Sequence, residues 1–403
     1  MNRRHLVIGR RGVLAGTGML AMPAIVRAQA RASGVAMVIG NSKYEWEAQL
    51  PNVKRDAPDI VKRFQDLGLK TEYVENATQA ALKDAVARFA AAAKGAPLAA
   101  FYFAGHGVKE GFNSYLVPVD CDLSDPSVVK TLTSVPSINA VAKNAAHTLE
   151  IFDNCRNNPA DGWKQVETDR MAVSTVESQV ALGGKLPNLI SLFSTCPGRT
   201  ALDGPAGQNS PFCAALLRHL SGPSVDIAQL PAKLRRDLLL ATDGQQVVYD
   251  YNTYTQPFSI KGAGAASGGA PVPATQVIEL PQAYAFAQQN DLVMPPGLVA
   301  IRGAADGRKT GAFRYQTKSQ GPAMFIVLSV NEKGVANVIL VGKDAKSHYW
   351  RLTSGNLKGD KLVFQPSAKS GLYTYTWRDA NTGTLENTFA KTRIDMPFTR
   401  LDG

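Results

Sequence analysis

The chain has 403 residues, of which 45% are hydrophobic and 19% are charged, proportions of a globular protein long enough for two or more domains. Its formal net charge is +11, but five arginines and no acidic residue lie in the first thirty positions, which leaves +6 for the remainder. The remainder has no long basic run and no basic-aromatic module, so we expect no nucleic-acid partner. The cysteines form no Cys-x-x-Cys pair, which excludes the common metal-site spacings and leaves any disulfide pairing open. They are Cys121, Cys155, Cys196 and Cys213.

Residues 1–30 have the composition of a removable signal peptide. The pair Arg10-Arg11 precedes a short apolar run, and a small-x-small cleavage signal ends at Ala30. Paired arginines are typical of the twin-arginine export route of bacteria. The apolar run is too short to span a membrane comfortably, so a retained membrane anchor is the less favoured alternative. We therefore expect a periplasmic or secreted protein with no stable membrane insertion after signal removal.

Apolar strands alternate with helices from the end of this segment to about residue 260. Such alternation predicts parallel β–α–β units whose sheet is covered on both faces, an α/β fold. Helices are expected after the turn that ends at Asn52 and after Thr78, which is suited to cap a helix. The other expected helices are 137–144, 211–220 and 225–240, and the expected strands are 35–39, 70–74, 98–103, 115–119, 149–152 and 188–193.

Two of these predicted strands end in a residue with nucleophilic or acid–base chemistry. The strand at 98–103 runs into Ala-Gly-His106-Gly, and the strand at 149–152 runs into Asp-Asn-Cys155-Arg. The carboxyl ends of parallel strands share one edge of a sheet, so we expect His106 and Cys155 to lie close together. Taken singly, His106 is better explained as a structural histidine and Cys155 as an inert thiol. Together, a thiol and an imidazole are the minimum for a cysteine nucleophile, and the sequence predicts a cysteine peptidase.

The segments around these residues resemble the caspase-like cysteine peptidases, and more closely the bacterial metacaspases and paracaspases than the animal caspases. The resemblance covers about residues 34–260 and rests on VIGNSKY at 38–44, YFAGHGV at 102–108 and DNCRNNP at 153–159. His106 and Cys155 are 49 positions apart, in line with the spacing of about 50 in caspases. The resemblance implies a caspase-like αβα sandwich around a mostly parallel sheet. It also implies hydrolysis of peptide bonds through a thioester.

Individual roles follow from the same resemblance. Cys155 corresponds to the nucleophile and His106 to the general base and acid. The backbone N–H groups of Gly107 and Cys155 correspond to the oxyanion donors. The alternative function is a non-catalytic peptide-binding scaffold on a caspase-like fold, with the C-terminal β-domain as a targeting module. The presence of both His106 and Cys155 argues against that alternative.

Three acidic residues correspond to positions that line the primary pocket in family members that cut after Arg or Lys. They are Asp153, two residues before the candidate nucleophile, Asp56 and Asp203. Carboxylates attract a guanidinium or ammonium group, and their planar geometry suits Arg. Asp56 is explained almost equally well as a helix cap, and Asp203 as part of an Asp-Gly-Pro turn. We therefore expect protein or peptide substrates with Arg or Lys before the cut.

The polar stretch from 160 to 185 has no clear periodicity. It contains Arg170 and Lys185, which makes self-cleavage a hypothesis, with an ordinary surface loop as the favoured alternative.

Calcium activates many metacaspases, but the chain contains no loop of the EF-hand type. Asp120, Asp122 and Asp125 are close enough in sequence to suggest a cation site, although a solvated acidic turn explains them better. No cofactor is predicted with certainty, and calcium activation is left open. We expect a monomer rather than a dimer.

The sequence beyond the peptidase region has a different pattern. Residues 31–262 form the predicted peptidase domain, residues 263–276 a Gly/Ala/Pro-rich linker, and residues 277–403 a β-rich accessory domain. Short strands at close spacing in this last part predict an all-β sandwich or barrel. Alternation places Tyr373, Tyr375 and Trp377 on one face, where we expect a packed core rather than an aromatic binding strip.

Overall fold

The computed structural model describes most of the chain beyond the first 33 residues. The predicted signal peptide, almost all of the predicted linker and the candidate processing sites Arg170 and Lys185 lie outside the described residues. The described residues are 34–110, 113–155, 171–172, 188–196, 199–222, 224–254, 257–261, 276–302, 309–317, 321–343, 348–365, 371–389 and 392–402.

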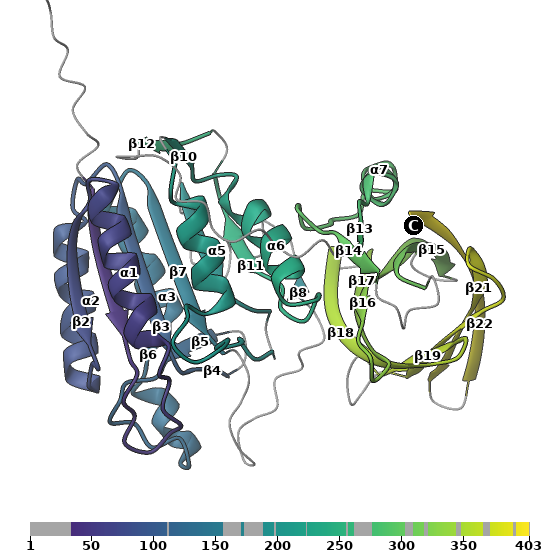
Figure 1. Cartoon of the computed structure of the whole chain (residues 1–403), viewed down its shortest axis with the longest axis horizontal. Helices are drawn as coiled ribbons and strands as arrows, with labels where there is room; N and C mark the ends of the chain where they lie inside the picture. The colour runs from purple at the N-terminus through teal and green to yellow at the C-terminus, as the bar shows by residue number, and fades with distance from the viewer. Residues whose placement is uncertain are drawn as a thin grey trace, which may run out of the picture. The chain divides into compact units, whose positions relative to one another are not determined.

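A six-stranded sheet forms the centre of the N-terminal part, as the alternation of strands and helices predicted (Figure 1). Its strand order is β11-β9-β7-β3-β1-β2; all neighbours are parallel except β11, which runs antiparallel to β9. β3 and β7 lie in the middle and are buried along their whole length, which explains their unbroken apolar sequence. The strands are β1 (Val35–Gly40), β2 (Lys70–Glu75), β3 (Ala99–Gly105), β7 (Thr148–Asn154), β9 (Leu189–Phe193) and β11 (Tyr249–Asn252).

Helices cover both faces of this sheet, so the predicted αβα sandwich is confirmed (Figure 1). On one face, Ile60, Phe64 and Phe212 bring α1 and α5 against the sheet, and α6 joins the same apolar cluster. On the other face, Phe89 of α2 packs on Phe101 of β3. The helices are α1 (Val53–Asp66), α5 (Pro211–His219) and α6 (Leu230–Ala241) on the first face, with α2 (Gln79–Ala92), α3 (Val135–Asn139) and the 3₁₀ turn η2 (Ala140–Asn144) on the second.

The helix expected at 225–240 starts later than predicted. Its first residues form the short strand β10 (Ser224–Asp226), which pairs with β12 (Ser259–Lys261), and α6 begins only at Leu230. Pro231 lies in the first turn of α6, where the missing N–H of proline costs no hydrogen bond. The position of this proline therefore explains where the helix starts.

The C-terminal part is a closed β-barrel, one of the two architectures predicted for it. Consecutive strands from β15 to β22 pair antiparallel with their neighbours, and pairing of β22 with β15 closes the ring. The short strand β8 (Met171–Ala172) also pairs with β18. The barrel strands are β15 (Gly311–Thr317), β16 (Gly321–Val330), β17 (Val335–Lys343), β18 (His348–Lys358), β19 (Lys361–Phe364), β20 (Leu372–Trp377), β21 (Thr382–Phe389) and β22 (Thr392–Asp402).

Aromatic side chains fill the centre of the barrel. Tyr375 and Trp377 are buried among Phe313, Phe325 and Phe398. The expectation that the aromatic residues of β20 form a core is thus confirmed for these two. None of the helices among the described residues is long and apolar enough to cross a membrane.

Candidate active site

The pairing of β3 with β7 fixes the relative height of the two candidate catalytic residues. Gly105 is the register partner of Asn154, so the next residue of each strand, His106 and Cys155, leaves the sheet at the same level. Both residues line one cavity at this edge. The structure therefore brings together the two side chains that the sequence placed at neighbouring strand ends.

The His106 ring is fixed by two contacts with the loop that follows β1. Its Nε2 lies 2.7 Å from the carbonyl oxygen of Ala48, and its ring centroid lies 4.5 Å from that of Tyr44. A carbonyl oxygen only accepts hydrogen bonds, so Nε2 carries the hydrogen in this contact. In the neutral imidazole, Nδ1 is then the basic nitrogen.

The hydroxyl of Tyr44 holds the main chain at His106. It accepts the His106 N–H at 2.7 Å and donates to the carbonyl oxygen of Val117 at 3.3 Å. Burial raises the pKa of Tyr44, so the hydroxyl stays protonated and able to donate. A side chain at Gly105 would lie 2.5 Å from this hydroxyl, which explains the glycine before His106.

Gly107 begins β4 (Gly107–Glu110), which pairs with β5 (Asn113–Leu116) in a small sheet completed by β6 (Thr133–Ser134). Val117 donates its N–H to His106 O, so these two form a hydrogen-bonded pair of the antiparallel ladder. Hydrogen-bonded pairs alternate with non-hydrogen-bonded pairs along an antiparallel ladder. The next pair, Gly107 and Leu116, is therefore not hydrogen-bonded. The Gly107 N–H therefore points away from β5. A Cβ at Gly107 would overlap the Asn154 amide, so only glycine fits.

Cys155 is partly buried, and its Sγ lies 4.0 Å from the carbonyl oxygen of Ala201. Burial is the main cause that raises the pKa of the Cys155 thiol, and the nearby carboxyl groups of Asp153 and Asp203 raise it further. The thiol is thus protonated at neutral pH. All four cysteines are free thiols.

The three predicted pocket acids line the same cavity as His106 and Cys155. Burial raises the pKa of Asp153 to about 7, with the neighbouring Asp56 as the second cause. Burial likewise raises the pKa of Asp56 to about 6, against the opposing effect of its hydrogen bonds, and raises the pKa of Asp203. Among the described residues no lysine or arginine lines this cavity. The arrangement is a negatively charged hollow without a basic side chain of its own.

The alternative explanation of Asp56 as a helix cap is wrong. Asn52 occupies the N-cap position of α1, while Asp56 lies in the first turn, is buried, and accepts the Ser210 N–H at 3.1 Å. Asp203 precedes Gly204, whose φ of +81° marks a turn. Asp203 therefore lies in a turn, as the alternative explanation had it, and also lines the cavity.

Sequence reasoning missed the residues that support these acids. Ser210 donates its hydroxyl hydrogen to Asp153 Oδ2 at 2.8 Å and caps α5 by accepting the Cys213 N–H at 3.0 Å. Asn52 donates to the carbonyl oxygens of Asp203 and Pro205, which holds the loop before α5. A serine directly before the first proline of a helix is a cap signal, and it was the one available clue to Ser210.

The aspartates of the turn at residues 120–125 bind main-chain N–H groups. Asp120 accepts the N–H of Gln79, while Asp122 and Asp125 accept the N–H groups of Ser124 and Ser127. Among the described residues no group of three or more His, Cys, Asp or Glu side chains is arranged to hold a metal ion. Asp122 and Asp125 thus cap local turns, and Asp120 holds the first residue of α2.

A thiol and an imidazole at adjacent strand ends of an αβα sandwich define a class, the cysteine peptidases of caspase-like fold. Comparison with known families agrees: residues 33–259 match the model of the caspase domain, peptidase family C14. The chain belongs to this family and is a caspase-like cysteine-type hydrolase with protease function.

Caspase-1 from Spodoptera frugiperda is similar over 59% of this chain and 92% of its own, with 15% identity and a TM-score of 0.42. The comparison with curated proteins found no match.

Proposed function

We propose that the protein is an exported cysteine endopeptidase, of the bacterial metacaspase or paracaspase type, that cleaves peptide bonds after Arg or Lys. The observation that carries the specificity is the cavity shared by Asp56, Asp153 and Asp203 with His106 and Cys155. Export rests on the sequence of residues 1–30 alone. The proteolytic mechanism rests on the position of His106 and Cys155.

A substrate with a basic side chain before the cut supplies the positive charge that this cavity lacks. Two of the acids already accept hydrogen bonds from the protein: Asp56 from Asn209 and Ser210, and Asp153 from Ser210. No described group donates to the carboxylate of Asp203, so it is the acid most accessible to a substrate guanidinium. A desolvated carboxylate gains most from a paired, hydrogen-bonded cation, and the guanidinium fork fits a carboxylate better than an ammonium does.

The reaction begins with transfer of the Cys155 proton to Nδ1 of His106, while Nε2–H stays bonded to Ala48 O. The thiolate attacks the carbonyl carbon of the residue before the cut. The N–H groups of Gly107 and Cys155 stabilise the oxyanion, at about 3–4 kcal/mol of barrier per donor in well-studied hydrolases. His106 returns the proton to the leaving amine, which gives a thioester. Water, deprotonated by His106, hydrolyses the thioester and restores the thiol.

Substrate charge assists the first step. The carboxyl groups of Asp153 and Asp203 raise the pKa of Cys155. A guanidinium bound between them neutralises this field and lowers the pKa of the thiol. The nucleophile is therefore activated most by the substrates that the pocket binds best.

The test is a peptide screen with the purified protein, with and without calcium, in which only the residue before the cut varies. The proposal predicts rapid cleavage of Arg and Lys peptides and none by Cys155→Ala, whose circular dichroism should match the wild type. Rapid cleavage of Asp-ended peptides without cleavage of Arg-ended ones would contradict the specificity. Cell fractionation tests export. If the protein is exported, the mature form should be found outside the cytoplasm and should start near residue 31.

A further inference from the structure

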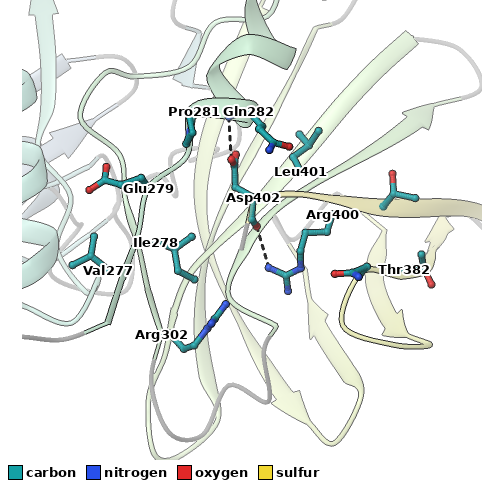
Figure 2. Close-up of a pocket in the computed structure, with 12 residues that line it drawn as sticks. Val277, Ile278, Glu279, Pro281, Gln282, Arg302, Thr382, Arg400, Leu401 and Asp402 are labelled. Carbon is teal, nitrogen blue, oxygen red and sulfur yellow. Dashed lines mark hydrogen bonds between the residues drawn. The ribbon is translucent and has the colours of Figure 1, made fainter.

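A second pocket lies at one end of the barrel, far along the chain from the candidate active site (Figure 2). Its volume is about 800 Å³, within the range of small-molecule sites, which often occupy the mouths of β-barrels. This pocket is open to solvent and is lined by β13 (Gln276–Ile278), β14 (Ala300–Arg302), the start of α7 (Pro281–Gln289), the start of β21 and the end of β22.

One part of the pocket wall is apolar and another carries charge. Val277, Ile278, Pro281 and Leu401 supply the apolar side. The charged residues are Glu279, Arg302, Arg400 and Asp402. The kind of ligand that the pocket can bind depends on which of these four charged side chains already have partners within the protein.

Both acids of the pocket have partners. The Asp402 carboxylate accepts the N–H groups of Gln282 and Ala283, at 3.0 and 2.6 Å, and thereby caps α7 (Figure 2). Glu279 pairs with the guanidinium of Arg236 at 2.5 and 2.9 Å. Both carboxylates are thus held by groups of the protein, and neither pairs with Arg302.

Arg400 is fixed by the main chain. Its guanidinium donates to the carbonyl oxygens of Ala380, Thr310 and Asp402, and its Cζ lies 4.5 Å from the centre of the Phe313 ring. These contacts hold the guanidinium at a fixed place in the wall.

Arg302 has no such partners. Its side chain points into the pocket (Figure 2), and its Nε is buried without a hydrogen-bond partner. No carboxylate of the described residues pairs with it. A buried N–H without an acceptor is unfavourable, and a ligand that accepts a hydrogen bond from Nε removes that penalty, while the rest of this partly exposed side chain remains open to a ligand. The neighbouring residues Ala300 and Ile301 are buried, so β14 holds the start of this side chain in place.

We propose that this pocket binds a small organic anion in which a carboxylate is attached to a short apolar group. The carboxylate accepts hydrogen bonds from Arg302 in the fork geometry that suits a guanidinium and a carboxylate. The apolar group packs on Ile278, Pro281 and Leu401. The β-domain is thus a ligand-binding module, a role that does not depend on the proteolytic one.

The test is calorimetric titration of the full chain with N-acetyl-L-leucine and with N-acetyl-L-leucinamide, which lacks the carboxylate, and with inorganic phosphate. We expect saturable binding of the acid and binding at least about tenfold weaker for the amide, since a hydrogen bond to a charged group is worth about that factor. Binding of phosphate alone, binding of both leucine probes equally, or binding of neither would overturn the proposal.

Arg302→Gln removes the charge and keeps most of the side chain. We expect it to weaken binding of N-acetyl-L-leucine at least about tenfold, while the melting temperature of the unliganded protein stays the same or rises because no native partner is lost. Lys333→Gln, in the exposed turn between β16 and β17, removes one charge from the same barrel and should bind as the wild type does. Wild-type affinity in a folded Arg302→Gln protein would overturn the assignment.

Discussion

The phenolic oxygen of Tyr44 accepts the main-chain N–H of His106 at 2.7 Å, and the two rings lie 4.5 Å apart. This contact makes Tyr44 a positioning residue for the imidazole, because one side chain orients both the backbone and the ring of His106.

Tyr44→Phe keeps the ring and removes the hydroxyl, which leaves the His106 N–H without its acceptor. We expect kcat for an Arg peptide to fall about tenfold with little change in KM, and the free energy of unfolding to fall by about 1–3 kcal/mol. Steady-state kinetics and urea unfolding measure the two effects. Tyr73→Phe, which removes a hydroxyl from β2, is the control, and wild-type kcat in Tyr44→Phe would exclude the positioning role.

Asp203→Asn removes the pocket charge with the smallest structural role, since Asp203 is partly exposed and no described group donates to its carboxylate. We expect KM for Arg peptides to rise about tenfold, the loss of roughly one charge-assisted hydrogen bond, with kcat less affected. The melting temperature should stay near that of the wild type. An unchanged KM would remove Asp203 from the substrate pocket.

The pocket acids also predict how substrate binding depends on pH. The pKa values of Asp56 and Asp153 are raised to about 6 and about 7, so both ionise as pH rises from 5 to 8. KM for an Arg peptide should therefore fall at least about tenfold across this range, since a bound cation favours the ionised carboxylates. The matched peptide with citrulline, a neutral analogue of arginine, should show little change. The same KM profile for both peptides would contradict the account.

Glu150 predicts a pH dependence of stability. Its side chain is completely buried in β7 and accepts the Ser191 hydroxyl at 2.6 Å, and burial raises its pKa to about 8. The pKa of Glu150 is higher in the folded protein than in the unfolded chain. Its contribution to stability is therefore complete below about pH 4.5 and is lost as the pH rises through about 8.

We therefore expect the free energy of unfolding to fall between pH 5 and pH 9, with Glu150 contributing on the order of a few kcal/mol. Glu150→Gln, which cannot ionise, should lose less stability over the same range. Urea unfolding at both pH values measures this, and Glu75→Gln on exposed β2 should behave as the wild type. If Glu150→Gln lost as much stability between the two pH values as the wild type, the Glu150 carboxyl would not be the cause of the pH dependence.

Much of the peptidase fold could be predicted from sequence because its central strands are unbroken apolar runs that end in reactive residues. His106 and Cys155 were predicted in this way, and the register of β3 with β7 places them at one level. The role of Ala48 had no sequence signal, since every residue has a carbonyl oxygen. Ser210 and Asn52 were missed because they act through contacts with residues that are distant in sequence.

The barrel could be predicted only as one of two architectures. Strands that alternate between apolar and polar residues have the same sequence pattern in a sandwich and in a barrel. The two architectures differ in whether the last strand pairs with the first. Here Tyr315 of β15 pairs with Phe398 of β22, a contact across more than eighty positions that no local pattern reveals. Burial of Tyr375 and Trp377 followed from alternation alone, and that prediction was correct.

The most direct test of the central claim is covalent labelling with a peptide that ends in an Arg-derived electrophilic ketone, followed by peptide mapping. We expect one adduct, on Cys155, with none on the buried Cys121, Cys196 or Cys213, and greatly slowed labelling in His106→Ala. A matched Asp-ended reagent should not react. Labelling of another cysteine instead, no labelling at all, or preferential reaction with the Asp-ended reagent would contradict the account.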